Sequence, residues 1–227
     1  MKKLFTSIRA SDLEMVRQII EKKPELVNCV AKQPPKKDDG QSPLQVALKT
    51  GNTAIANYLL DMGADVNFIE DESCCNSWRT PVIHDAINCA VMSCRWNTND
   101  KNMGFKVFST KEKAAEALDV LKRMLDTGAD VNACDSYGNS GLNRFALQAK
   151  QILPSYNYAE HREGTDRIFT EELHEDLRSV LQALKDAGAD DSYKAPNLGY
   201  SVSEFCDEGS SRLLFDEVFG ASLRLRR

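Results

Sequence analysis

Two short runs of sequence, Ser42-Pro43-Leu44-Gln45-Val46-Ala47 and Gly63-Ala64-Asp65-Val66-Asn67, decide how this chain of 227 residues folds. The first run predicts the start of a helix, because a hydroxyl side chain caps a helix and proline suits its first turn. The second predicts a helix end, because a left-handed residue is needed there and glycine adopts that conformation. Between the two runs the apolar residues recur at helical spacing, as Ile55, Leu59 and Leu60 do. Residues 42–67 therefore predict a pair of helices closed by a glycine loop.

Both signals recur along the chain. The helix-ending run returns as Gly128-Ala129-Asp130-Val131-Asn132 and, in weaker form, as Gly188-Ala189-Asp190-Asp191-Ser192. The helix-opening run returns as Thr80-Pro81 and as Ser140-Gly141. Amphipathic helices are expected between these signals, at 113–126 and 171–185. Self-similarity of this kind indicates a repeat architecture.

The two ends of the chain predict degenerate copies of the same unit. Residues 2–10 and 12–22 predict a first helix pair, and residues 201–206 and 211–219 predict a last one. Terminal repeats of a solenoid need an atypical outer face, which explains the weak motifs there. We therefore expect one domain over residues 1–227, built from five helix pairs. Its repeats would lie at about 1–30, 38–70, 76–134, 135–193 and 197–222.

The quoted residues resemble the ankyrin repeat, whose hallmarks are a D-x-x-G-x-T-P-L-H-x-A opening and an L-L-x-x-G-A-D-V-N close. The match is specific at residues 42–67, good at both ends of the third and fourth repeats, and degenerate at the termini. The resemblance implies an all-α solenoid of stacked helix pairs joined by hairpin loops. It also implies that the chain is not an enzyme and binds another protein through a concave face of loop tips and first helices.

In this family the variable contact positions flank the opening motif. Carried onto this sequence, they predict eleven partner-binding residues: Asp38, Asp39, Gln41, Lys49, Ser77, Trp78, Arg79, Ser136, Tyr137, Asn139 and Arg144. Trp78 stands where the consensus has glycine, and two interpretations of it stay open. An aromatic residue beside Arg79 on a loop tip has the composition of a binding hot spot. The ring could equally pack over the loop of the next repeat.

The third and fourth repeats are longer than the second. From Pro43 to Gly63 is 20 positions, whereas Pro81 to Gly128 and Gly141 to Gly188 each span 47. The surplus falls between the two helices of each pair and includes the polar stretches 95–110 and 154–170. One interpretation is longer helices with a surface loop, since repeat arrays accept insertions on one edge. The other is a second contact surface at that edge.

Composition narrows the remaining classes of function. The formal net charge is −5, which argues against a nucleic-acid partner. No apolar run is long enough to span a bilayer. The seven cysteines are odd in number and suggest reduced thiols in a cytoplasmic protein. We expect no cofactor and a monomer.

The long insertions and short array look like bacterial ankyrin proteins, some of which neutralise a cognate toxin.

A metal-binding or enzymatic protein is the main alternative. His84 lies beside Cys89 and Cys94 in the sequence, with Cys74 and Cys75 upstream. No C-x-x-C pair occurs, and two cysteines so spaced on one helix converge poorly on a metal. Resemblance to the family's T-P-L-H motif implies that His84 ties neighbouring loops together. No phosphate-binding loop or catalytic pair is evident. A structural adaptor without an obligate partner is a third option.

Overall fold

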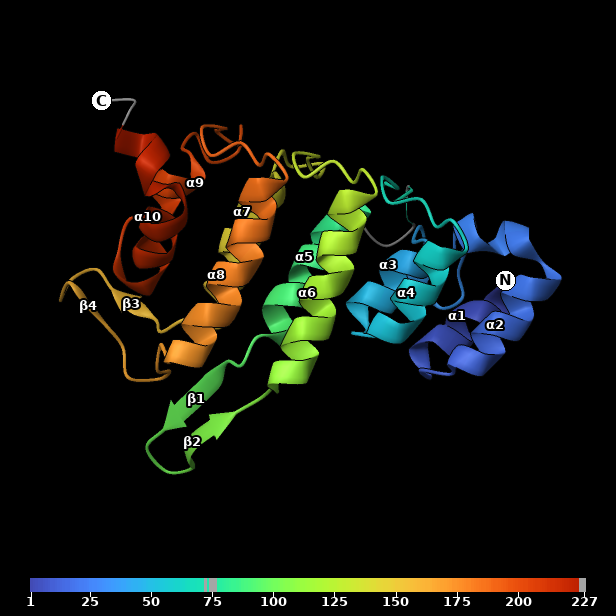
Figure 1. The fold of residues 1–227 in the computed structure, drawn as a ribbon, viewed down its shortest axis with the longest axis horizontal. Helices are drawn as coiled ribbons and strands as arrows, with labels where there is room; N and C mark the ends of the chain where they lie inside the picture. Colours follow the sequence, from blue (N-terminus) through green and yellow to red (C-terminus); the bar gives the residue numbers. More distant parts are fainter. Residues whose placement is uncertain (72, 74–76, 225–227) are drawn as a thin grey trace.

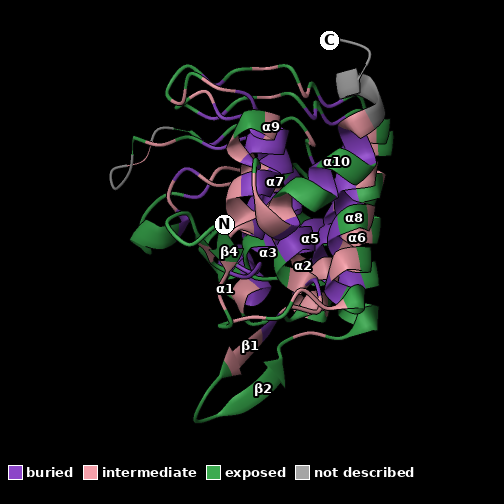
Figure 2. Ribbon diagram, turned by 90° about the vertical axis from the view of Figure 1, so that its left-hand side faces the viewer, coloured by how far each residue is buried: buried purple, intermediate pink, exposed green. Residues whose placement is uncertain are grey.

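The computed structural model describes residues 1–71, 73 and 77–224, with side chains up to residue 220. Its helices stand side by side in an elongated array of two layers (Figures 1 and 2). The first layer holds α1 (Lys2–Arg9), α3 (Pro43–Lys49), α5 (Val82–Ser93), α7 (Gly141–Ala149) and α9 (Val202–Phe205). The second holds α2 (Leu13–Lys22), α4 (Thr53–Asp61), α6 (Lys111–Asp126), α8 (Glu171–Asp186) and α10 (Gly209–Arg224). Short 3₁₀ helices, η1 (Pro24–Asn28) and η2 (Lys36–Asp38), complete the N-terminal loops.

This arrangement confirms the predicted helical solenoid. Consecutive helices pack as antiparallel pairs, and each pair packs on the next, as α1 does on α3, α3 on α5 and α5 on α7. The C-terminal pair is less regular, because α9 is a single turn that packs on α7 while α10 packs on α8. The number of five repeats therefore stays a prediction at that end.

The predicted helix-opening signal acts as expected where serine provides it. The Ser42 hydroxyl accepts a hydrogen bond from the Gln45 amide, and the Gln45 side chain accepts one from the Ser42 amide in return. Ser140 and Ser201 begin α7 and α9 with the same reciprocal bonds. This satisfies main-chain donors that a helix start would otherwise leave unpaired.

The expected cap at Thr80 is wrong. Helix α5 begins at Val82, Pro81 takes the cap position, and no side chain caps the helix. The Thr80 hydroxyl is buried and makes no hydrogen bond to any described residue. The third repeat has four residues between Pro81 and Ala86, where the second has three between Pro43 and Ala47. The added residue lets the helix start one position later relative to proline.

The Gly-Ala-Asp-Val-Asn runs are explained by an asparagine ladder, formed by Asn28, Asn67 and Asn132. Each side-chain amide donates to the glycine carbonyl of the next repeat, at 3.1, 3.0 and 3.0 Å. Each side-chain carbonyl accepts from the aspartate amide two residues after that glycine, at 2.8, 2.8 and 2.9 Å. The ladder ends where Ser192 replaces asparagine. The recurrent motif therefore fixes how one repeat stacks on the next.

The apolar residues form one core cluster that runs along the array from Leu4 to Phe219. Helix α5 lies at its centre and packs against α3, α6, α7 and α8. Nine of its twelve residues are buried, and full burial of one large apolar side chain contributes about 1.5–3 kcal/mol. No described helix is long and apolar enough to cross a membrane.

The insertions of the third and fourth repeats form longer helices and two small hairpins. Helices α6 and α8 have 16 residues each, against 9 in α4, so the expected longer helices are confirmed. Strands β1 (Asn97–Asp100) and β2 (Gly104–Val107) pair antiparallel, as do β3 (Tyr156–Asn157) and β4 (Arg162–Glu163). The sequence did not predict these strands, because β1 is entirely polar and β3 and β4 have only two residues each, so none of the three shows an alternation of apolar and polar residues.

Candidate partner-binding face

The two ends of the helices differ, and we name them by what connects there. The loop end holds the loops between repeats, which project on the side of the first-helix layer (Figure 2). The insertion end holds the two hairpins. At the loop end, neighbouring loops are joined through their main chains: the Asp71 amide donates to the Gly40 carbonyl at 2.9 Å, and the Ser136 amide to the Arg79 carbonyl at 3.0 Å. The loops and first helices therefore form one continuous face.

A groove of about 440 Å³ opens in this face between α3 and α5. Its walls come from the end of α3, the loop before α5, and α5 itself. Its lining residues include Lys49, Trp78, Thr80, Asp85, Asn88 and Met92. Apolar walls with a few polar groups are typical of sites that accept part of another molecule.

Asp85 gives the groove an acidic floor. Its buried carboxylate accepts a hydrogen bond from the Gln45 side chain at 3.1 Å and lies 3.9 Å from the Lys49 ammonium, which also pairs with Glu70. Burial is the main cause that raises the pKa of Asp85 to about 7; the charge of Glu70 acts in the same direction, and Lys49 and the Gln45 hydrogen bond oppose the rise. One lysine thus serves two carboxylates, and a second cation placed in the groove would favour the ionised form of Asp85.

The loop of the fourth repeat is built around buried Asp135. Its carboxylate accepts hydrogen bonds from the amides of Tyr137 and Asn139 at 2.9 and 3.0 Å, and from the Arg144 guanidinium at 3.1 Å. Burial alone would raise the pKa of Asp135, but hydrogen bonds led by those from Asn139 outweigh it and hold the pKa below the ordinary value. This rigid turn presents the Tyr137 ring, 56% exposed, to solvent.

Trp78 connects the groove to this turn. The Arg144 guanidinium lies over the Trp78 ring at 5.0 Å from its centre, within the range of a cation–π contact. The ring is half-buried and also lines the groove. It therefore packs against the fourth repeat and faces the groove at the same time. Its role as a binding hot spot stays a prediction.

The structure divides the eleven predicted contact residues into three groups. Exposed side chains belong to Lys49, Ser77, Arg79, Ser136 and Tyr137, and half-buried ones to Asp39, Gln41, Trp78 and Arg144. Asp38 is only 2% exposed and pairs with Arg9, and Asn139 is only 6% exposed and bonds to Asp135. These last two hold their own loops in shape, so we leave them out of the face.

Lys49 and Trp78 are the predicted contact residues that line the groove, whereas Asp85 and Met92, on α5, are among the lining residues that the sequence analysis missed. The contact positions of the family flank the loop part of the opening motif, whereas Asp85 lies near the end of that motif, within α5. A signal was present in the sequence. Asp85 is the one charged residue between Val82 and Ser93, and a charge on a buried helix needs a partner or a function.

His84, Cys89 and Cys94 of the third repeat do not form a reactive site. His84 is buried, its Nε2 lies 2.9 Å from the Ala133 carbonyl, and burial is the main cause that lowers its pKa to about 4. It ties the third repeat to the following loop, as the resemblance implied. Burial raises the pKa of the Cys89 thiol to about 11 and that of Cys94 further, which opposes formation of a nucleophilic thiolate.

Metal ligation finds no support within the described residues, where no group of three or more His, Cys, Asp or Glu side chains is placed to hold an ion. Cys74 and Cys75 lie outside the described residues.

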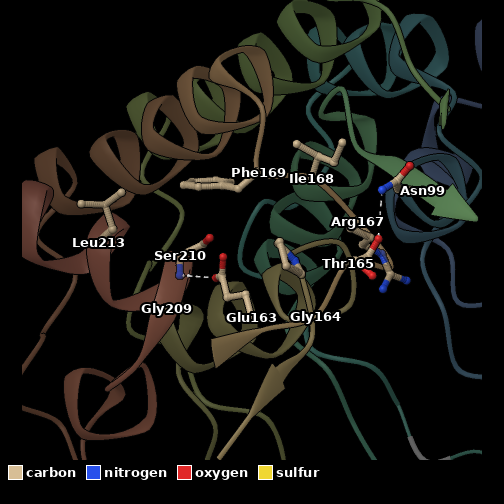
Figure 3. A pocket seen from close by; sticks show the side chains of 11 residues that line it. Asn99, Glu163, Gly164, Thr165, Arg167, Ile168, Phe169, Gly209, Ser210 and Leu213 are labelled. Carbon is tan, nitrogen blue, oxygen red and sulfur yellow. Dashed lines mark hydrogen bonds between the residues drawn. The ribbon is translucent and has the colours of Figure 1, made fainter. Parts of the chain in front are cut away.

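A second hollow, of about 560 Å³, lies at the insertion end (Figure 3). Its polar groups bond to each other: Glu163 accepts from the Ser210 amide at 2.6 Å, and the Asn99 side chain donates to the Thr165 carbonyl at 3.1 Å. Phe169 and Leu213 provide much of its apolar lining. These polar groups hold α10 and the two insertions together. Because they are bonded to each other, they do not converge on a common point in the hollow.

The N-terminal part of the chain matches a family model. The family model described as ankyrin repeats (3 copies) matches residues 3–95. That range covers the first two helix pairs and continues through α5. No curated protein matches the chain.

Proposed function

Because this chain is an ankyrin repeat protein, we propose that it binds one partner protein through the face formed by its first helices and inter-repeat loops. Ankyrin repeats in general mediate protein–protein interaction. The observation that carries the proposal is the groove between α3 and α5, with the Trp78 ring on its wall and buried Asp85 on its floor. The partner would present a basic side chain to Asp85 and an apolar surface to Trp78 and Tyr137.

We also propose how binding acts. The chain would occlude the surface of its partner, in the manner of bacterial ankyrin proteins that neutralise a cognate toxin. It would be a single domain over residues 1–227, supported by the one core cluster along the array. It would be monomeric alone and would work in the reducing cytoplasm, which suits the described cysteines, since all five are free thiols.

The test is purification of the tagged chain from its own cells, followed by measurement of its affinity for the protein that co-purifies. The double variant Trp78→Ala with Tyr137→Ala should weaken binding by about 2 kcal/mol or more, which is about thirtyfold. Addition of an equal amount of the chain should also suppress whatever activity the partner has.

Tyr158 offers a matched control. It has the same exposed fraction as Tyr137, 56%, but lies at the insertion end. Tyr158→Ala should leave the affinity unchanged. The proposal fails if Tyr158→Ala weakens binding while the double variant at the loop end does not.

A further inference from the structure

The hairpin of the third repeat exposes apolar side chains on a projecting strand. It extends past the ends of the helices (Figure 1), and every residue of β2 is exposed (Figure 2). Met103 is 85% exposed and Phe105 50%, and Val107 and Phe108 are exposed as well. Contiguous apolar groups in water on such a projection are typical of an interaction surface.

This hairpin is held firmly at its base. The Arg95 guanidinium bonds to Asp176 of α8 at 2.7 Å, and the Ser109 hydroxyl bonds to the Ser93 carbonyl at 2.6 Å. The Trp96 and Phe108 rings stack with their centres 4.3 Å apart. The strand is therefore presented in a fixed position, which lowers the entropic cost of binding to it.

One edge of the hairpin is already occupied. The Asn99 amide donates to the Asp166 carbonyl at 2.7 Å, and the Asn97 side chain bonds to both main-chain groups of Ile168, at 2.7 and 2.8 Å. The second insertion thus runs antiparallel along the outer side of β1. This use of β1 leaves β2 as the outer strand on the opposite side.

The outer edge of β2 offers main-chain donors and acceptors. Residues 97 and 107 face each other in the register, as do 99 and 105, while the Phe108 amide donates to the Trp96 carbonyl. Hydrogen-bonded and non-hydrogen-bonded pairs alternate in an antiparallel ladder. Phe105 and Val107 therefore point their N–H and C=O groups outward, and no other described residue bonds to them. A lysine on an edge strand opposes pairing with an identical strand, and Lys106 has this position in β2.

The charge around this edge selects the partner. Four lysines are exposed on or beside the hairpin, Lys101, Lys106, Lys111 and Lys113, and they outnumber the two exposed acidic residues there, Asp100 and Glu112. The Lys106 ammonium lies 4.9 Å from the centre of the Phe108 ring. A second copy of the chain is disfavoured, because antiparallel pairing of two β2 strands centred on Lys106 would place the two lysines opposite each other. An acidic side chain opposite Lys106, flanked by apolar ones opposite Phe105 and Val107, is favoured.

We propose that β2 accepts an extended acidic segment of a partner protein, which adds a strand to the hairpin. The segment alternates apolar and acidic residues. Its main chain bonds to Phe105 and Val107, and its carboxylates face the lysines. This site lies at the opposite end of the helices from the concave face and does not depend on the function proposed there.

The experiment uses the full chain and two labelled synthetic peptides, one of alternating valine and glutamate and one of alternating valine and lysine. We expect the glutamate peptide to bind about fivefold more tightly, given the strength of cross-strand charge pairs. The amides of Phe105 and Val107 should exchange hydrogen more slowly in the complex, as measured by NMR.

Three variants make the test decisive. Lys106→Glu should reverse the preference between the peptides, and it leaves the ladder intact. Val107→Pro should abolish binding, because it removes an outward N–H that β1 does not use. Tyr137→Ala should bind the peptides normally, which separates this site from the concave face.

Equal binding of both peptides to Lys106→Glu would overturn the proposal. So would a dimer in sedimentation that Val107→Pro converts to monomer, because the edge would then serve a second copy.

Discussion

The loop end and the insertion end of this molecule differ in how regularly their contacts repeat. At the loop end the same neutral hydrogen bonds repeat from one unit to the next, through Asn28, Asn67 and Asn132. At the insertion end each contact occurs once and is often ionic, as in the pairing of Arg95 with Asp176. The loop end therefore sets the stacking of the array, whereas the insertion end is free to differ between repeats.

Residues at both ends can therefore change without loss of the fold. Loop tips beyond the asparagine ladder carry exposed residues such as Tyr137, and the fixed ladder holds them in place. Hairpins at the insertion end add surface without altering the stacking, because they lie outside the helix layers.

The largest expected effect comes from the ionic contact at the insertion end. Arg95→Ala should lower the free energy of unfolding by about 3 kcal/mol, because it leaves the Asp176 carboxylate poorly solvated and unpaired. The two side chains are only 15% and 10% exposed. Denaturant titration measures the change.

Arg123 provides the control for this prediction. It pairs with Asp61 between α6 and α4, but the Asp61 side chain is largely exposed. Arg123→Ala should cost at most about 1 kcal/mol. Equal costs for the two variants would show that the Arg95 pair does not hold the insertion end.

A smaller, pH-dependent effect is expected in the groove between the two ends. The pKa of Asp85 in the folded protein, about 7, lies above its ordinary value of 3.8, so ionisation destabilises the fold as pH rises from about 4 to 7. Asp85→Asn should therefore stabilise the protein by about 2 kcal/mol at pH 8 and have little effect near pH 4.

Thermal unfolding of the Asp85→Asn variant and the unmodified chain across this pH range gives the comparison. The titration of His84 is common to both and cancels in the difference. A stabilisation that does not change with pH would contradict the assigned shift.

The smallest effect is expected at the loop end. Asn67→Ala should lower the free energy of unfolding by about 1 kcal/mol, because its two hydrogen bonds are exposed to water. Asn102→Ala, an exposed position outside the ladder, should change stability by less than about 0.5 kcal/mol. If the two variants behave alike, the ladder does not set the stacking.

Local chemistry made the repeat predictable from sequence. Ser42 and Gln45 bond to main-chain groups only three residues away. Asn67, which follows Gly63, bonds to the glycine carbonyl at the equivalent position of the next repeat. The spacing of these residues in the sequence therefore reveals their role. The longer second helices followed from the residue count.

Other features depended on contacts between distant segments. The strands of the first insertion are fixed by pairing of Asn97 and Asn99 with the second insertion, about which the local sequence carries no information. The burial of Asp38 was hidden because its partner, Arg9, belongs to another repeat. Asp85 was visible as a charge on a buried helix, but its place in a groove required the packing of α3 on α5.

Hydrogen–deuterium exchange of the chain, alone and with the protein that co-purifies with it, shows which face the partner covers. We expect the partner to slow exchange at residues 77–80, 88–92 and 136–138, which line the groove and the adjacent loop. Protection confined to the hairpins at 97–107 and 156–163, with the loops unchanged, would contradict it.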